Sequence, residues 1–489
     1  MQEKQNSKKY FQALSVFILA LGFFFMALTI NNRSVLAAVV DKQTIPLEKK
    51  LGMNIFGDSF KANPRTNTDS DPNSVFESRW NTDIDAMKQL NMKYVRLGAS
   101  YSTLLSKDNE GDNNNPSNYN DYDFSRLDYA IHSAKSAGLT PIISMYADSN
   151  IASKNNDTNY NNSAYPDDLA RTKDLINQLV DHEADKGVLW EGFNEAESGS
   201  QDYWFGQTDM EADDKQKLKD VVMMDKYFQD QVNKYDQAYD SNPDSNFITG
   251  DLGGSSGLAN EIINLDPGVF DNTKNNKTSG FGSFHAYKGY TPEDVLKGNT
   301  NDQVLTQTDP TADWSSWDAK EIESLRAQGL KPAITEFGYP YPDGWSLGGS
   351  ESRQQQSDNL EREIFSLDME GADMIIPFTM EHTNAQWALK NSSDQNQTSP
   401  ASAFSNLQKL MNQLHGYTFS QKVSSEDNSL GNHSDDNGNY VLKYTKDNSP
   451  DKYVYWTTTA DNKDLDHTLE INGTPVTATA SPQISEPHS

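Results

Sequence analysis

The chain has 489 residues, no cysteine, and 41 basic against 71 acidic side chains, so its formal net charge is −30. This length suffices for a barrel of alternating strands and helices plus one small domain, and a core of that size requires no disulfide. The negative charge disfavours a nucleic-acid partner because it repels a phosphate backbone. The lack of cysteine excludes a thiol nucleophile and a cysteine-ligated zinc site.

Residues 1–37 have the layout of a secretory signal peptide. Three lysines precede an uncharged apolar stretch over residues 13–30, and small or aliphatic residues follow at 35–37. Because the stretch is 18 residues long, an uncleaved membrane anchor is the alternative. We expect the remainder to be secreted and extracellular, or attached to the cell surface, as in a Gram-positive bacterium. Removal of residues 1–37 takes away four cations and one anion, which changes the net charge to −33.

After a linker over residues 38–49, strand-like and helix-like segments alternate as far as residue 414. Strands are expected over residues 51–55, 93–97, 139–145, 187–193, 246–251, 281–287, 332–337 and 374–379. Helices are expected over residues 80–90, 122–137, 168–183, 218–239, 316–328, 357–369 and 403–414. Eight strands separated by helices predict an α/β fold, a (β/α)8 barrel over residues 50–414.

The pattern changes over residues 415–489. Strand-like segments at 440–444 and 452–459 are separated by turns rich in Asn, Asp and Gly, with no helical period. We therefore expect a small antiparallel β domain, which either covers the flank of the barrel or binds carbohydrate. The acidic loop at 108–123 lacks the ligand spacing of a calcium-binding loop, so no metal is expected there.

Two glutamates stand at the ends of apolar strands. The fourth expected strand ends in Trp-Glu-Gly-Phe-Asn-Glu at 190–195, and the seventh ends in Thr-Glu-Phe-Gly at 335–338. Catalytic side chains of parallel barrels project from these C-terminal strand ends. Glycoside hydrolysis requires two facing carboxylates, one that protonates the leaving oxygen and one that attacks the sugar or positions water. Glu195 and Glu336 are therefore the candidate catalytic pair.

Both motifs resemble those of the clan A glycoside hydrolases, and the resemblance covers about residues 50–400. It includes Val-Arg-Leu at 95–97 and Phe-His-Ala-Tyr at 284–287, and it is loosely similar to families 5 and 39 without favouring either. The resemblance implies a retaining enzyme for β-glycosidic bonds, with Glu195 as acid/base and Glu336 as nucleophile. Ala196 replaces the proline of many members, and the third strand is followed by Asp148 without their histidine, so the sugar stays open.

Further site residues follow from the same resemblance. Arg96 and Tyr287 would hydrogen-bond the nucleophile, Asn194 would bond the 2-hydroxyl of the sugar, and His285 would make a second contact. Aromatic rings that follow the strand ends would pack on sugar faces, although each ring is as well explained by loop packing. These rings are Tyr203, Trp204, Phe205, Tyr339, Tyr341, Trp345 and Trp387.

Two other classes of function compete with this prediction. A catalytically silent surface protein would bind glycans through the barrel rim or the C-terminal domain, but it would not need the set of Arg96, Tyr287 and two glutamates. A barrel enzyme of other chemistry, such as an aldolase or a metal-dependent hydrolase, lacks an evident Schiff-base lysine or histidine cluster at the strand ends. We expect a monomer that acts on carbohydrate without a metal or organic cofactor and has no membrane contact beyond residues 1–37.

Overall fold

The computed structural model divides the chain into two units, residues 1–44 and 45–489. The structure describes residues 45–55, 72–99, 104, 122–145, 169–194, 223–235, 246–252, 280–287, 292–293, 321–323, 325–326, 330–341, 352–380, 387–389, 403–423, 438–458 and 467–486. The expected signal peptide at 1–37 and most of the linker at 38–49 lie outside these residues. No helix within the described ranges is long and apolar enough to cross a membrane.

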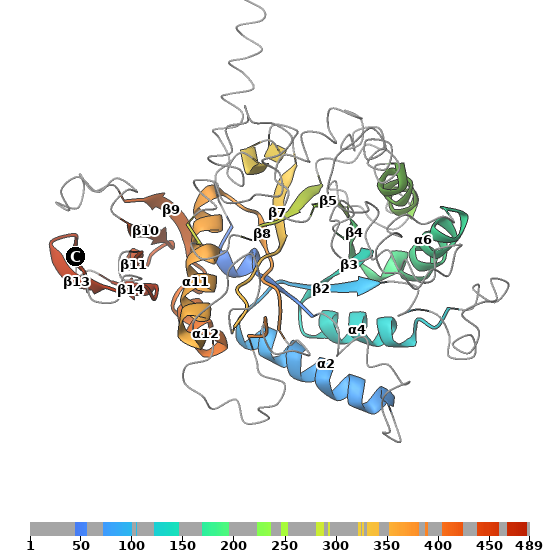
Figure 1. Cartoon of the computed structure of the whole chain (residues 1–489), viewed down its shortest axis with the longest axis horizontal. Coiled ribbons are helices and arrows are strands. Elements are labelled where there is room, and N and C mark those ends of the chain that lie inside the picture. Colours follow the sequence, from blue (N-terminus) through green and yellow to red (C-terminus); the bar gives the residue numbers. More distant parts are fainter. Residues whose placement is uncertain are drawn as a thin grey trace, which may run out of the picture. The chain divides into compact units, whose positions relative to one another are not determined.

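Eight parallel strands lie side by side in chain order, as Figure 1 shows for most of them. They are β1 (Gly52–Asn54), β2 (Tyr94–Ala99), β3 (Thr140–Met145), β4 (Leu189–Phe193), β5 (Phe247–Leu252), β6 (Phe281–His285), β7 (Lys331–Glu336) and β8 (Met374–Ile375). The ring closes where Leu51 forms a parallel bridge with Ile375 and the Asn54 N–H donates to the Pro377 carbonyl at 3.1 Å. The predicted (β/α)8 barrel is confirmed.

The helices lie on the outside of the barrel, where all but the last connect successive barrel strands and the last follows β8. They are α2 (Pro72–Gln89), α4 (Ser125–Ser136), α6 (Leu169–Glu183), residues 223–235, residues 321–323, α11 (Arg353–Glu370) and α12 (Ala403–Gln413). Helix α2 begins before the expected residue 80, since Pro72 is tolerated in a first turn and the Phe76 ring packs 6.2 Å from that of Trp80.

Helix α11 also begins earlier than the apolar pattern predicts, because polar contacts define its first turn. The Ser352 hydroxyl accepts the Gln355 N–H at 3.1 Å, and the Gln356 amide donates to the Tyr339 carbonyl at 2.6 Å. The helix ends at Gly371, whose φ of +96° is a left-handed conformation that suits glycine.

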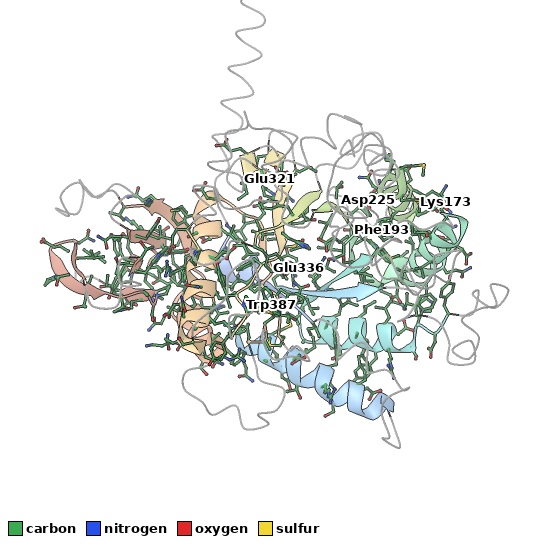
Figure 2. The ribbon with its side chains drawn as sticks, in the orientation of Figure 1. Lys173, Phe193, Asp225, Glu321, Glu336 and Trp387 are labelled. Atoms are coloured by element: carbon green, nitrogen blue, oxygen red, sulfur yellow. The ribbon has the colours of Figure 1, made fainter. Side chains whose placement is uncertain are left out.

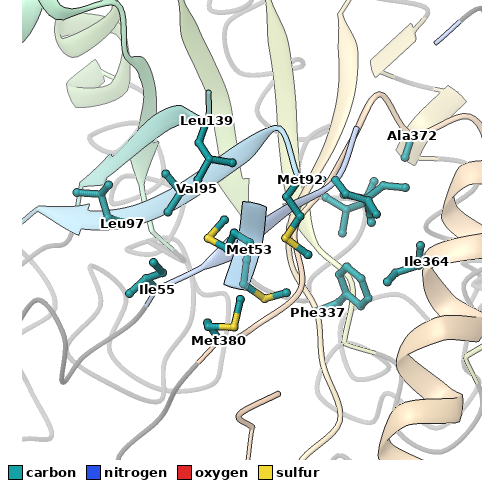
Figure 3. Packing of buried hydrophobic residues seen from close by; sticks show 14 of the residues in the cluster. Met53, Ile55, Met92, Val95, Leu97, Leu139, Phe337, Ile364, Ala372 and Met380 are labelled. Carbon is teal, nitrogen blue, oxygen red and sulfur yellow. The ribbon is translucent and has the colours of Figure 1, made fainter. Parts of the chain in front are cut away.

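Apolar side chains fill the barrel in separate layers. One cluster consists of Ile142, Ile248, Ala333, Met374 and Ile376. The first three come from the alternate strands β3, β5 and β7, as expected for a layered barrel interior, Met374 lies in β8 and Ile376 follows it. The larger cluster lies between strands and helices, and Figure 3 shows Met53 of β1 and Ile55, which follows that strand, beside Met380.

The C-terminal region forms two antiparallel sheets, as predicted. Four strands have the order β14-β11-β10-β9, and a separate pair is formed by β12 and β13. Their bounds are β9 (Thr418–Lys422), β10 (Asn439–Thr445), β11 (Lys452–Thr457), β12 (His467–Ile471), β13 (Thr474–Ala478) and β14 (Gln483–Ser485). The last barrel helix ends at Gln413 and the first strand of this region begins at Thr418.

Buried charges attach the four-stranded sheet to the barrel through α11. Lys50, which precedes β1, donates to Asp368 of α11 at 2.8 Å, and the Tyr444 hydroxyl of β10 donates to the other carboxylate oxygen at 2.8 Å. All three side chains are at most 1 % exposed. The segment before β1 and the C-terminal sheet are therefore bound to one carboxylate, and the sheet is part of the barrel's support.

Replacement of Asp368 by alanine should lower the free energy of unfolding by about 3–5 kcal/mol, because the Lys50 ammonium would stay buried without a counter-ion. Urea denaturation measures the change. The matched control is Asp230→Ala, which breaks the exposed pair with Lys226 and should cost less than about 1 kcal/mol. Equal losses in the two variants would contradict the account of this interface.

Burial raises the pKa of Glu361, on α11, well above its ordinary value, and the charge of Asp358 adds to the rise. The folded protein therefore holds a proton on Glu361 that the unfolded chain releases above about pH 4.5. The free energy of unfolding consequently falls as the pH rises from about 4.5 towards the raised pKa of the folded state. Glu361→Gln keeps an acceptor for the Ser357 hydroxyl and removes the titration. Between pH 5 and 8 this variant should lose less stability than the wild type, while Glu323→Gln, at an exposed position, should follow the wild type.

Candidate active site

One buried arginine occupies the centre of the barrel at the ends of its strands. Arg96 of β2 is 1 % exposed and makes at least five hydrogen bonds with its three guanidinium nitrogens. The acceptors are Asn54 Oδ1 (2.9 Å) of β1, Ser144 Oγ (3.0 Å) of β3, Glu191 Oε2 of β4, Asn194 Oδ1 (2.9 Å) after β4, and Glu336 Oε1 (2.6 Å) of β7. A single cation therefore joins four strands of the barrel to β2.

Two carboxylates share the Arg96 guanidinium. Arg96 stands between two carboxylates, since its Nε donates to Glu191 and its Nη1 donates to Glu336. Glu191 is fully buried and Glu336 is 5 % exposed. Guanidinium stays charged and presents donors in a planar fork, so it can serve both carboxylates at once. One buried side chain therefore binds both carboxylates.

Both carboxylate oxygens of Glu336 have a donor. Arg96 serves Oε1, and the Tyr287 hydroxyl, after β6, donates to Oε2 at 2.9 Å. His285 Nδ1 lies 3.8 Å from the same Oε2 and the imidazole is buried. Figure 2 shows Glu336 in the middle of the barrel, close to Trp387. The structure thus gathers Arg96, Tyr287, His285 and Asn194 around the expected nucleophile, and their roles stay predictions.

Trp387 lies beside this group. Its ring meets Tyr287 edge to face at a centroid distance of 5.5 Å and Phe378 at 6.0 Å. Glycine at 338 allows this arrangement, because a Cβ there would lie 2.5 Å from the Phe378 carbonyl oxygen and 3.2 Å from the Trp387 ring. The segment after Glu336 is thereby held against the segment after β8.

Tyr339 differs from the expected position on the catalytic rim. It is 2 % exposed, and its hydroxyl donates to Glu363 of α11, so the ring lies in the packing between β7 and that helix. Burial, together with the charge of Glu363, raises the pKa of Tyr339 well above its ordinary value. Tyr341 is half-buried beneath the Arg353 guanidinium, 4.9 Å from its ring centre.

The strand that precedes Glu195 in the sequence and the strand that carries Glu336 each contain one extra residue. Ser144 pairs with Glu191 and Met145 pairs with Phe193, so Gly192 is a bulge in β4. In β7, Thr335 is the extra residue, and the Asn54 amide donates to its carbonyl at 2.8 Å. Bulges of this kind re-aim side chains next to active sites.

Sequence reasoning assigned no role to three buried partners of Arg96, namely Asn54, Ser144 and Glu191. Glu191 stands in the quoted motif, and its place on an apolar strand was the available signal. Asn54 and Ser144 carry no such signal, because lone polar residues in a strand are common. Glu195, Trp204 and Trp345, as well as Tyr203 and Phe205, lie outside the described residues. Glu195 directly follows Asn194 in the sequence.

One group of possible metal ligands occurs among the described residues, on helices α4 and α6. Asp128, His182 and Glu183 bring three ligand atoms within 4.8 Å of one another. The Lys186 ammonium bonds Asp128 and pairs with Glu183 Oε2 at 3.1 Å, so a cation of the protein already serves both carboxylates. We assign no metal to this group.

Comparison with known proteins agrees with this geometry. The model of the family described as cellulase, glycosyl hydrolase family 5, matches residues 56–369, which is well over half of the chain. The chain belongs to glycosyl hydrolase family 5. This membership confirms the resemblance to clan A and the prediction of an enzyme that hydrolyses O-glycosidic bonds, with carbohydrate as the substrate.

Solved structures share the fold of this family 5 enzyme at low sequence identity. A family 39 glycoside hydrolase from Bacteroides cellulosilyticus WH2 is 16 % identical with a TM-score of 0.55, over 90 % of this chain and 80 % of the other. A glucosidase from Croceicoccus marinus is 11 % identical with a TM-score of 0.50, over 91 % and 83 %. No curated protein sequence matches the chain significantly.

Replacement of Arg96 by lysine should lower kcat/KM of the family 5 enzyme on a responsive glycoside by at least about 100-fold. An ammonium cannot reach five acceptors spread over four strands, so both Glu336 and the strand ends would lose their fixed positions. The matched control is Arg326→Lys at the partly exposed pair with Asp373, which should leave kcat/KM within a few-fold. Unchanged turnover in Arg96→Lys would refute the central role of the guanidinium.

Proposed function

We propose that the protein is a secreted retaining glycoside hydrolase that cleaves β-glycosidic bonds of an oligo- or polysaccharide by double displacement. The observation that carries the proposal is the pair of donors, Arg96 and Tyr287, on the two carboxylate oxygens of Glu336. Such donors hold a carboxylate in one orientation for attack on a sugar carbon. Secretion is supported by the layout of residues 1–37.

In the first step Glu336 attacks the anomeric carbon and forms a glycosyl ester, while the bond from that carbon to the leaving oxygen breaks. Glu195 gives its proton to the leaving oxygen, so that the released sugar departs as an alcohol. The negative charge of Glu336 is consumed as the ester forms. Tyr287 and Arg96 keep the ester oxygens in place.

In the second step water attacks the same carbon from the face that the leaving sugar vacated. Glu195, now ionised, takes the water proton, and the ester bond to Glu336 breaks to restore its carboxylate. Two inversions give a product of retained configuration. Asn194 Oδ1 accepts from Arg96, which leaves the amide NH2 group of Asn194 as the donor for the 2-hydroxyl, a contact that strengthens in the transition state.

The substrate is proposed to be a β-linked glucan or a related polymer. The matched family is described as cellulase, which supports a β-linked glucan as the substrate. Trp387, next to Tyr287, offers a ring on which the apolar face of a sugar can pack. A catalytically silent glycan-binding protein is the alternative, and the buried Arg96–Glu336 pair argues against it because binding alone does not need a buried, oriented carboxylate.

The variants Glu336→Ala and Glu195→Ala should each lose nearly all turnover, on the order of 10⁴-fold or more in kcat, since each removes a group that makes or breaks a bond. With an activated aryl β-glycoside, external azide should partly restore Glu336→Ala and give a glycosyl azide of inverted configuration. Azide should restore Glu195→Ala with retained configuration. Product analysis by NMR distinguishes the two anomers.

The matched control is Glu323→Ala, at an exposed position outside the barrel, which should keep wild-type turnover. Full activity in both glutamate variants would refute the assignment of the catalytic pair. Measurable glycan binding by the wild type, with no hydrolysis across β-linked glucans and related polymers, would instead favour the silent binding protein.

A further inference from the structure

A buried carboxylate outside the catalytic group contacts the strand that leads into it. Asp225 lies on the helix of residues 223–235 and is 5 % exposed. Its Oδ1 accepts the backbone N–H of Phe193, the last residue of β4, at 3.1 Å. Figure 2 shows the two residues side by side. A buried carboxylate is costly unless it is hydrogen-bonded, so this contact with the strand end is a specific structural feature.

The contact falls on the bulge of β4. Because Gly192 is the extra residue, the strand steps out of its regular pairing with β3 between Glu191 and Phe193. A Cβ at position 192 would lie 2.7 Å from Asp225 Oδ1 and 2.8 Å from Oδ2. The carboxylate therefore sits directly on the bulged backbone, and glycine is needed there for it to do so.

The bulge decides which side chains of β4 face Arg96. In a regular strand successive side chains alternate, so residues three positions apart point to opposite faces. Glu191 and Asn194 are three apart, yet both bond the Arg96 guanidinium. The extra residue changes the phase of the alternation, and Phe193 packs into the apolar core instead.

We propose that Asp225 is a positioning residue of the active site, which holds the bulge of β4 so that Asn194 faces Arg96 and the 2-hydroxyl of the bound sugar. This inference rests on the proposed function. Without the carboxylate, the N–H of Phe193 would lack this acceptor in a buried environment, and the strand end would shift to a different arrangement. Asn194 would then lose its alignment with the sugar.

The test compares Asp225→Ala and Asp225→Asn on a p-nitrophenyl β-glycoside that the wild type cleaves and on its 2-deoxy analogue. On the parent glycoside, Asp225→Ala should lower kcat by about 10- to 100-fold with a smaller change in KM. On the 2-deoxy analogue, which lacks the hydroxyl that Asn194 would bond, the loss should be only a few-fold. Asp225→Asn keeps an oxygen acceptor for the N–H and should stay within about five-fold of the wild type on both.

A second variant, Gly192→Ala, displaces the carboxylate by its new Cβ and should show the same selective loss if Asp225→Ala does not fold. The control on the same helix is Asp230→Ala, an exposed position that should not alter either substrate. Equal losses on the two substrates would overturn the proposal, because a general structural defect does not distinguish them.

Hydrogen exchange of the Phe193 amide gives a readout that does not need turnover. Exchange should be at least about ten-fold faster in Asp225→Ala than in the wild type or in Asp225→Asn. A wild type that cleaves no glycoside would refute the proposed function while exchange still reports on the bulge. Unchanged exchange in Asp225→Ala would overturn the role of Asp225 whatever the activity.

Discussion

The guanidinium of Arg96 is the interaction on which the described active site depends. Its donors reach acceptors on β1, β3, β4 and β7, so these strands must be in register before every acceptor can be satisfied. Removal of any one partner would leave a buried polar group unpaired, which is costly in a low-dielectric interior. The same cation that holds the expected nucleophile therefore also fixes the geometry of the barrel's catalytic end.

Polar contacts also specify the positions that apolar packing leaves open. Asn54 and Asp225 each bind backbone groups at a strand bulge, one at Thr335 and one at Phe193. Apolar packing is largely non-directional and tolerates small shifts, whereas a hydrogen bond to a single backbone group does not. On helix α11, the Asp368 carboxylate likewise fixes two other side chains, because it accepts hydrogen bonds from Lys50 and Tyr444.

The sequence alone predicted most of the fold, because hydrophobic periodicity and glycine stops are local signals. All eight strands were found, but β8 is shorter than expected since Pro377 cannot donate to a neighbouring strand. The motifs indicate Glu336, Arg96 and Tyr287 as candidate site residues, and their roles stay predictions. The motifs do not indicate Asn54 and Asp225, because the structural role of each depends on a bulge in a neighbouring strand. A bulge is visible only in the pairing of two strands that are distant in sequence.

The hydrogen bonds of Asp368 have a consequence for when the active site can form. Lys50 and Asp368 are 318 residues apart, and Asp368 also bonds Tyr444, so the supporting network joins the start of the barrel, its last long helix and the C-terminal sheet. Contacts of such long range form late and slow the folding of a domain. The catalytic geometry is thus a property of the whole polypeptide, and a nascent or truncated chain lacks it. Hydrolysis is therefore expected only once the residues from Lys50 to Tyr444 have been synthesised and have folded together.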